Sequence, residues 1–155
     1  MKNSEECYMH EALKEAVRAF EKDEVPVGCV IVHKGQIIAR GHNQVEMLKD
    51  PTAHAEMIAL TSAAGALGAK WLNDCSVYVT IEPCSMCAGA MVLARVKDLF
   101  YGADDPKTGA CGSVADIVNN KKLNHRIKVT RGILKDECSA LLKGFFQQQR
   151  LKGKK

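Results

Sequence analysis

Two short segments, separated by residues 57–82, constrain how this chain can fold because together they carry the ligands of one metal ion. The first is His54-Ala55-Glu56 and the second is Pro83-Cys84-Ser85-Met86-Cys87. One imidazole and two thiolates suit zinc, so His54, Cys84 and Cys87 are the predicted metal ligands. Three protein ligands leave one coordination position open, which distinguishes a catalytic zinc from a closed four-ligand structural site. We therefore expect one catalytic Zn²⁺ per subunit.

Glu56 is the candidate catalytic residue, because it lies beside the predicted ligands and is not needed to bind the metal. A carboxylate in that position can relay protons to and from a reacting molecule. Cys84 and Cys87 are three residues apart, so both sulfurs can face one side of a helix N-terminus, where the helix dipole favours thiolates. His54 and Glu56 are two residues apart and diverge on a regular helix, so both reach one pocket only if the first turn distorts or the metal binds at its edge.

Composition indicates a single cytoplasmic domain. The chain has 155 residues, of which 46% are hydrophobic, enough for one core of ordinary size. The first residues are polar and charged, and no run approaches the eighteen apolar residues or so of a membrane span. Seven cysteines cannot all pair internally, which favours a reducing compartment. Thiols outside the motif are expected to lie in the core or at the surface: Cys7, Cys29, Cys75, Cys111 and Cys138.

Positive charge is concentrated at the end of the chain. The net charge is +4, and the segment from Cys138 onward contains no acidic residue. Its basic residues are Lys143, Arg150, Lys152, Lys154 and Lys155. Such a tail is either a solvated terminus or an arm that contacts the phosphates of a nucleic acid.

Apolar periodicity predicts alternating helices and strands. A first helix, capped by Asn3 or Ser4, runs to about residue 22, and residues 27–32 and 36–41 form a hairpin across Lys34-Gly35. A second helix runs to about residue 64 with Thr52 as its cap and His54 in its first turn. Strands at 77–81, 99–102 and 127–132 and helices at 84–95 and about 136–150 follow. The order predicts a mixed sheet between two helix layers.

The motifs resemble those of the bacterial tRNA adenosine deaminases, a branch of the cytidine deaminase-like zinc enzymes that share His-x-Glu and Pro-Cys-x-x-Cys. Stretches that carry the resemblance span most of the chain: 25–28, 41–43, 50–56, 82–91, 107–110, 124–126, 136–138 and Phe145-Phe146. The resemblance implies a three-layer α/β/α sandwich with a mixed five-stranded sheet, a homodimer, and hydrolysis of a wobble adenosine to inosine in a tRNA anticodon stem-loop. Glu56 is then the acid that moves the protons.

Further site residues are implied by the same resemblance. Asn43 and Ala55 are expected to contact the purine, and Asp105, Lys107 and Thr108 to lie near the sugar and phosphates of the target nucleotide. Phe145 and Arg150 are expected to contact RNA from the last helix. Two departures stand out: Gln147-Gln148-Gln149 replaces the arginines common in the family, and Pro106 stiffens the loop after Asp105.

Two other functions fit the same motif. One is a deaminase of free bases or nucleotides, which uses the same zinc chemistry but has no evident use for a basic tail. The other is a structural zinc module that binds nucleic acid, with Cys75, Cys111 or His42 as a fourth ligand. A closed four-ligand site distinguishes the second alternative from an enzyme.

Overall fold

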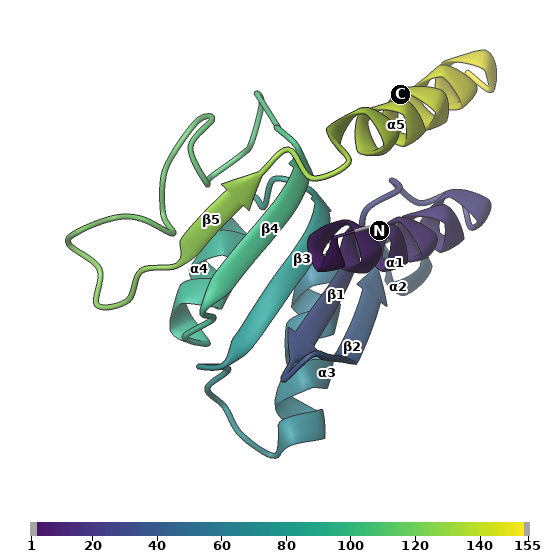
Figure 1. Cartoon of the computed structure of the whole chain (residues 1–155). Coiled ribbons are helices and arrows are strands. Elements are labelled where there is room, and N and C mark those ends of the chain that lie inside the picture. Colours follow the sequence, from purple (N-terminus) through teal and green to yellow (C-terminus); the bar gives the residue numbers. More distant parts are fainter. Residues whose placement is uncertain (1–2, 154–155) are drawn as a thin grey trace.

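The computed structural model describes residues 3–153, which form five helices and five strands (Figure 1). Lys154 and Lys155 of the predicted tail lie outside the described residues. The helices are α1 (Ser4–Glu21), α2 (Val45–Leu48), α3 (Ala55–Leu67), α4 (Ser85–Leu93) and α5 (Lys135–Leu151). The strands are β1 (Gly28–His33), β2 (Gln36–His42), β3 (Cys75–Ile81), β4 (Asp98–Ala103) and β5 (Lys128–Arg131).

The strands form one mixed sheet in the order β2-β1-β3-β4-β5. β1 pairs antiparallel with β2 and with β3, whereas β3, β4 and β5 are parallel. The β1–β2 turn is formed by Lys34 and Gly35, whose φ angles of 49° and 76° suit a two-residue hairpin turn that matches the strand twist. The predicted hairpin is therefore confirmed, and the parallel strands direct their carboxyl ends to one edge of the sheet.

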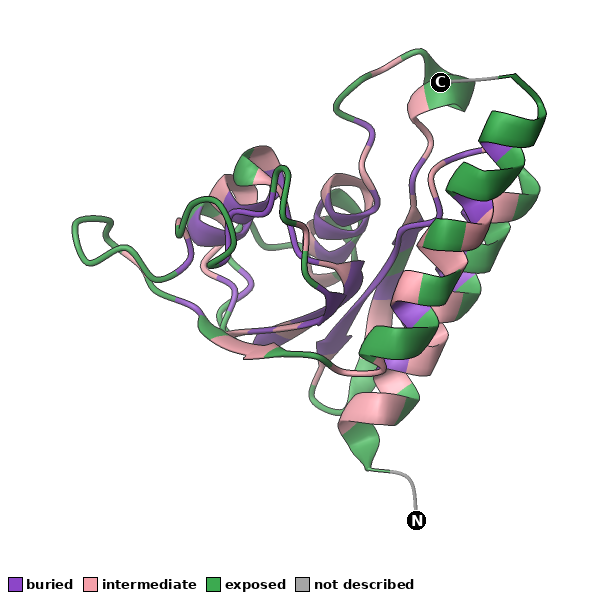
Figure 2. Cartoon of the chain, turned by 90° about the horizontal axis from the view of Figure 1, so that it is seen from above, coloured by how far each residue is buried: buried purple, intermediate pink, exposed green. Residues whose placement is uncertain are grey.

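Helices cover both faces of the sheet, as Figures 1 and 2 show. α1 and α5 lie on one face, where Met9, Val30, Tyr78 and Cys138 form a buried cluster. α3 and α4 lie on the other, over a larger cluster that includes Ile31, Val77, Val79, Leu99 and Met91. The predicted three-layer α/β/α sandwich with a mixed five-stranded sheet is confirmed. None of the helices between residues 3 and 153 is both long and apolar enough to cross a membrane.

Several predicted boundaries were wrong. Thr52 does not cap α3: its N–H and hydroxyl bond the Asp50 carboxylate, and His54 is the N-cap with extended backbone angles of −75° and 151°. The short helix α2 was not predicted, because four residues are too few to show a helical period. Asn3 is the cap of α1 as expected, and its side chain accepts a hydrogen bond from the Glu6 N–H (2.8 Å).

Gly41 lets α3 approach the sheet closely enough to place its first turn. A Cβ at this position would lie 2.5 Å from the Ala55 carbonyl oxygen and 3.0 Å from the Ala59 nitrogen, both of them backbone atoms of α3. Any side chain there pushes the start of α3 away from β2. The position of His54 and Glu56 thus depends on a glycine in the neighbouring strand.

Gly41→Ala should lower the free energy of unfolding by about 1–3 kcal/mol, because the helix must move to admit the methyl group. Gly65→Ala is the matched control, since no atom lies within 4 Å of a Cβ built there, in the interior of α3. That control should be neutral or stabilising by up to about 1 kcal/mol. Urea denaturation of both variants measures the difference, and equal stabilities would contradict the close approach.

Candidate active site

The three predicted ligands converge at the N-termini of α3 and α4. His54 is the N-cap of α3 and Cys84 the N-cap of α4. The Nδ1 atom of His54 lies 3.5 Å from the Sγ atoms of both Cys84 and Cys87. All three ligand atoms lie within 4.8 Å of one another, and no fourth His, Cys, Asp or Glu of residues 3–153 joins this group. One nitrogen and two sulfur donors with an open side fit a catalytic zinc ion.

The N-cap position of His54 explains how two residues so close in sequence serve one site. The His54 side chain leaves the chain before the helix begins, whereas Glu56 leaves from the first turn. The His54, Cys84 and Cys87 group therefore lies at the edge of α3. Of the two arrangements that the His54–Glu56 spacing allowed, a distorted first turn or a site at the edge of the helix, the second is observed. The Pro51 carbonyl accepts a hydrogen bond from the His54 ring, an arrangement that orients the other ring nitrogen toward the cysteines.

The hydrogen bonds among the three residues divide the protons unequally between the two thiols. Hydrogen bonds from Cys87 and His54 lower the pKa of Cys84 to about 4. The same hydrogen bond with Cys84, together with burial, raises the pKa of Cys87 well above its usual range, so the pair holds a single thiolate that accepts two hydrogen bonds. Burial raises the pKa of Cys111 and Cys138 to well above 9, which leaves these thiols as core residues, as expected.

Glu56 is a buried carboxyl group that opens onto the same cavity. Its residue is 3% exposed, and burial raises its pKa to about 7. It lines a cavity of about 1180 Å³ together with His54 and Cys84. It is not one of the converging ligands. A buried acid next to a metal group, with access to a cavity, can exchange protons with a bound molecule.

Five of the predicted contact residues also line this cavity: Asn43, Asp105, Lys107, Thr108 and Phe145. The Asn43 side-chain oxygen accepts a hydrogen bond from the Ala55 N–H (2.8 Å), which holds its amide against the start of α3. Ala55 itself is fully buried and supplies that backbone donor instead of lining the cavity. The side-chain NH₂ of Asn43 is then the polar group that faces a bound molecule.

Asp105 also lines the cavity, but its carboxylate shapes the loop that carries it. One oxygen accepts hydrogen bonds from the N–H groups of Lys107 (3.0 Å) and Thr108 (3.1 Å), and the other from the Thr108 hydroxyl (2.8 Å). This turn directs Lys107 and Thr108 into the cavity wall. The structure thus assigns Asp105 a conformational task in addition to its place at the cavity surface.

Glu82 holds the loop of residues 105–113 in place through hydrogen bonds to its backbone. Its carboxylate, 1% exposed, accepts hydrogen bonds from the N–H groups of Asp105 (3.1 Å), Cys111 (3.0 Å) and Ser113 (3.1 Å), and a short one from the Ser113 hydroxyl. A Cβ at Gly109 would lie 2.4 Å from the Glu82 carboxyl carbon, so only glycine lets the loop close over it. Sequence reasoning missed this residue, because an acid before a proline shows no pattern that reveals its partners.

α5 forms the wall of the cavity that faces the loop. Phe145, 5% exposed, packs edge-on against Phe20 with ring centres 5.8 Å apart, whereas Phe146 is 45% exposed and also lines the cavity. Gln149 donates a hydrogen bond to the Asp23 carboxylate (2.6 Å), which ties α5 to the end of α1. Arg150 is exposed beside it and does not line the cavity. Of the two phenylalanines, Phe146 is the one available for contact.

Glu24, which was not predicted from the sequence either, holds α2 at the opposite rim of the cavity. Glu24, 2% exposed, accepts hydrogen bonds from the N–H groups of Glu46 (2.9 Å) and Met47 (2.8 Å) and so caps α2. All three residues line the cavity. The negative charge lies at the positive end of the helix dipole. No sequence signal pointed to this cap, since Glu24 precedes the helix by more than twenty residues.

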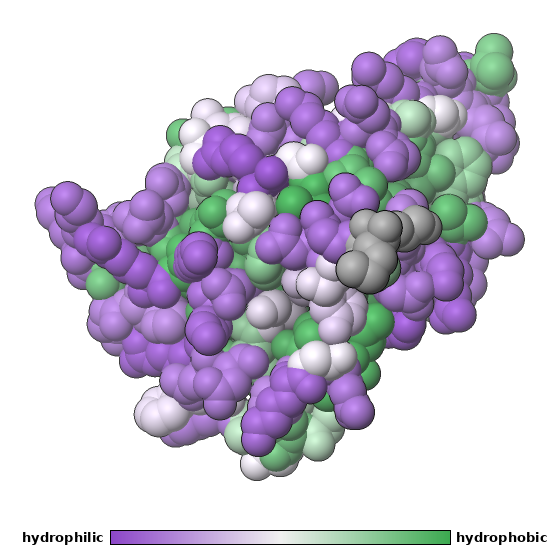
Figure 3. Space-filling view, in the orientation of Figure 1, coloured by the Kyte–Doolittle hydropathy of each residue, from purple (hydrophilic) through white to green (hydrophobic). Residues whose placement is uncertain are grey.

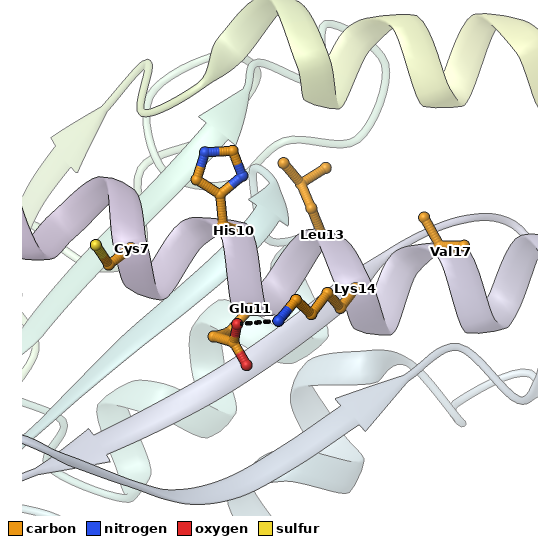
Figure 4. A pocket seen from close by; sticks show the side chains of 6 residues that line it. All are labelled: Cys7, His10, Glu11, Leu13, Lys14 and Val17. Atoms are coloured by element: carbon orange, nitrogen blue, oxygen red, sulfur yellow. Dashed lines mark ion pairs between the residues drawn. The ribbon is translucent and has the colours of Figure 1, made fainter. Parts of the chain in front are cut away.

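A smaller hollow of about 460 Å³ lies on the outer face of α1. Figure 4 shows that its lining side chains all project from this one helix, and that Glu11 pairs with Lys14 (2.7 Å). Among the described residues, its members form no metal-binding group.

Replacing Glu82 should loosen the loop without disturbing the ligands. In the wild type the donors of the loop share the two carboxylate oxygens of Glu82. In Glu82→Gln only one oxygen remains to accept them, and the new NH₂ group faces N–H groups that also donate. A buried donor left unsatisfied costs about 1–3 kcal/mol, so amide exchange at residues 105–113 should accelerate by about 5- to 150-fold.

Hydrogen exchange measured residue by residue checks this expectation. Ser113→Ala is the matched control, since it removes the hydroxyl donor and leaves the three backbone donors in place. Its effect should be several-fold smaller. If Glu82→Gln leaves exchange in the loop unchanged, the carboxylate is not its anchor.

Comparison with known proteins agrees with this geometry. A family model described as MafB19-like deaminase matches residues 3–150. The chain is 47% identical to the tRNA-specific adenosine deaminase of Bacillus subtilis (strain 168), over 97% of this chain and 93% of that protein. A solved structure from a study of A-to-I editing by tRNA:A34 deaminases at the wobble position of transfer RNA has a TM-score of 0.85 and 43% identity, covering 88% of this chain and 99% of that one. A guanine deaminase from Bacillus subtilis is less similar, with a TM-score of 0.64 and 34% identity over 97% and 94%.

Proposed function

We propose that this chain, which belongs to the family of the tRNA-specific adenosine deaminases, converts the wobble adenosine of a tRNA anticodon to inosine. The observation that carries the proposal is the His54, Cys84 and Cys87 group beside the buried acid Glu56 at one cavity. The reaction adds water to the base and releases ammonia, so that the amino group at C6 becomes a carbonyl.

A free base such as guanine is a less suitable substrate. The cavity of about 1180 Å³ extends from the ligands to Lys107 on one side and Phe146 on the other, far beyond the reach of one purine ring. Similarity to known proteins points the same way, since sequence identity is higher to the tRNA deaminases than to the guanine deaminase, and so is the TM-score of the tRNA:A34 deaminase structure. A substrate with a sugar, phosphates and neighbouring bases uses this extra surface.

The residues fit a zinc ion, and we propose that His54 Nδ1, Cys84 Sγ and Cys87 Sγ hold one per subunit. A zinc ion bound there lowers the pKa of water to about 7 and so supplies a nucleophile at neutral pH. The N-termini of α3 and α4 both point at the ligands. Their dipoles favour the negative charge that the two thiolates bring.

Glu56 moves the protons of the reaction. Its carboxylate accepts a proton from the attacking water and delivers it to the ring nitrogen next to C6, which makes that carbon easier to attack. A second proton then passes through Glu56 to the exocyclic nitrogen, which leaves as ammonia. Burial, which reduces exchange with bulk water, keeps the proton on this path.

The other cavity residues position the nucleotide. The Asn43 amide, fixed by its bond to Ala55, donates to the purine. Lys107 and Thr108, directed inward by the Asp105 turn, contact the sugar and phosphates, and Phe145 supports the exposed ring of Phe146 against the neighbouring bases. Arg150, exposed on the last turn of α5, contacts a phosphate at the mouth. Because tRNA is the substrate, we propose a cytoplasmic enzyme.

Glu56→Gln should retain zinc and lose turnover, because the ligands remain while the proton carrier does not. General acid–base catalysis contributes about 10²- to 10⁴-fold, and a residue that serves two transfers belongs near the upper end. Inosine formation on an adenosine-containing anticodon stem-loop measures the loss, and atomic absorption measures the metal.

Cys87→Ala is the comparison for this variant. It should lose metal and stability together, because two remaining ligands rarely hold zinc. Activity of Glu56→Gln within tenfold of the wild type would remove Glu56 from the mechanism. Wild-type protein that forms no inosine on the stem-loop would count against the proposed function itself.

We propose that the enzyme is a homodimer that uses the outer face of α4. Met86, Gly89 and Leu93 follow one another at helical spacing on the outer side of α4, and Leu93 is 79% exposed. Ala90, beside them, is half-buried and also packs against the core. A Cβ at Gly89 would meet no atom within 4 Å, so the helix offers a flat apolar surface to a second backbone. Met91 of the same helix faces inward and is fully buried in the core of its own chain, so it does not belong to this surface.

Leu93→Asp should convert the dimer to a monomer at micromolar concentration, because the charge would be buried without a partner. Light scattering should give twice the 16.9 kDa chain mass for the wild type and about one chain for the variant. Val17→Asp, which adds the same charge at an exposed apolar residue of α1, should leave the mass unchanged. A monomeric wild type would refute the dimer.

A further inference from the structure

The end of the sheet opposite the cavity carries a second concentration of positive charge. The carboxyl ends of β3 and β4 lead to the cavity residues Glu82 and Asp105, so the amino ends of these strands lie at the far end of the sheet. Three segments meet there: residues 68–74, 94–97 and 119–128. They carry one carboxylate, Asp74, and Asp98 follows the second segment as the first residue of β4. They also carry seven cations, which we call the basic end: Lys70, Arg95, Lys97, Lys121, Lys122, Arg126 and Lys128.

Hydrogen bonds join these segments into one surface. The Leu72 N–H donates to the Ala94 carbonyl (2.7 Å), which links the first segment to the second. The Arg95 guanidinium donates to the Asn124 carbonyl (3.2 Å), which links the second to the third. Figure 2 shows an exposed loop projecting from the side of the molecule away from α1, and Figure 3 shows the hydrophilic side chains over the same region. Charges from separate parts of the sequence are thus held together.

The cations of the basic end are not neutralised within the chain. Among residues 3–153, none of the seven forms an ion pair with a carboxylate. All except Arg95 are exposed. By contrast, Lys152 of the predicted tail lies 3.5 Å from the Asp23 carboxylate. A group of solvated, unpaired cations attracts a polyanion such as RNA and gains free energy from the counterions released.

An exposed aromatic ring lies among these cations. Trp71 is 50% exposed, with the Lys70 ammonium 4.8 Å and the Arg95 guanidinium 5.8 Å from the ring centre. A ring that can stack on a base, with cations beside it for the adjoining phosphates, is a combination that RNA-binding surfaces use. It favours RNA over a protein partner at this surface.

We infer that the basic end binds the phosphate backbone of the substrate RNA beyond the part held in the cavity. The inference rests on the proposed function. β3 has seven residues, and at about 3.3 Å per residue the basic end lies roughly 20 Å from the cavity. A DNA duplex advances about 3.4 Å per base pair and an A-form RNA duplex somewhat less, so the RNA must continue for at least roughly six base pairs to reach it. Long substrates therefore contact the basic end and short hairpins do not.

Two RNAs distinguish binding at the basic end from binding in the cavity: an adenosine-containing anticodon hairpin with a four-base-pair stem, and the corresponding full-length tRNA transcript. The variant Lys121→Gln/Lys122→Gln/Arg126→Gln should bind the full-length tRNA more weakly. Each lost phosphate contact lowers the slope of log affinity against log salt by about 0.9, so the slope should fall by up to about 2.7. Affinity for the hairpin and the single-turnover rate at saturation should stay as in the wild type.

Lys14→Gln/Arg18→Gln/Lys34→Gln is the control for net charge. It removes three cations from α1 and the hairpin turn, two of which pair with Glu11 and Glu15, and it should bind both RNAs almost normally. Equal weakening of the first variant on both RNAs, equal weakening by the control, or an unchanged affinity for the full-length tRNA would overturn the inference. So would a change in the mass of the first variant by light scattering, because the surface would then join two chains. Wild-type protein that forms no inosine on either RNA contradicts the proposed function instead.

Discussion

The meeting of two helix N-termini at one edge of the sheet is the constraint on which the rest of the structure depends. α3 and α4 are joined by β3, and both begin with a proposed metal ligand at the N-cap, His54 in one and Cys84 in the other. Because β3 and β4 are parallel, the chain after β4 returns to the same edge and places Asp105–Thr108 above the ligands. A shift of either helix would separate the donors, which explains why the closest backbone approach to α3 occurs at a glycine in β2.

Buried carboxylates organise this edge by accepting backbone donors. Glu82 holds the loop over the ligands, Glu24 caps α2 at the opposite rim, and Glu56 remains for chemistry. The three acids have similar burial but different surroundings. Glu82 and Glu24 each accept several hydrogen bonds from backbone N–H groups, so their oxygens are occupied in holding the chain. Burial dominates at Glu56 and raises its pKa to about 7, and an acid that exchanges its proton near neutral pH suits a proton carrier.

Much of this arrangement could be predicted from the sequence, because the metal ligands form a local motif and the sheet follows from alternating apolar segments. The hairpin, the order of the elements and the convergence of His54, Cys84 and Cys87 are of this kind. The predicted cap of α3 was wrong. By residue type Thr52 is a better N-cap than His54, and the start of the helix is instead set where α3 packs closely on β2. Glu82, Glu24 and the basic end could not be predicted, since their partners lie far away in sequence. The basic tail can be recognised in the sequence because its charges lie close together, whereas those of the basic end are distributed over three separate segments.

The hydrogen bond between Gln149 and Asp23 has a consequence for the order in which the molecule is completed during synthesis. All three ligands and Glu56 lie within the first 87 residues, but the opposite wall of the cavity requires Leu142, Phe145 and Gln149 near the end of the chain. A nascent chain therefore exposes its metal-binding groups well before the helix that encloses them has been made. The proposed metal ligands are therefore less enclosed in the unfinished chain than in the finished protein, where α5 completes the cavity wall.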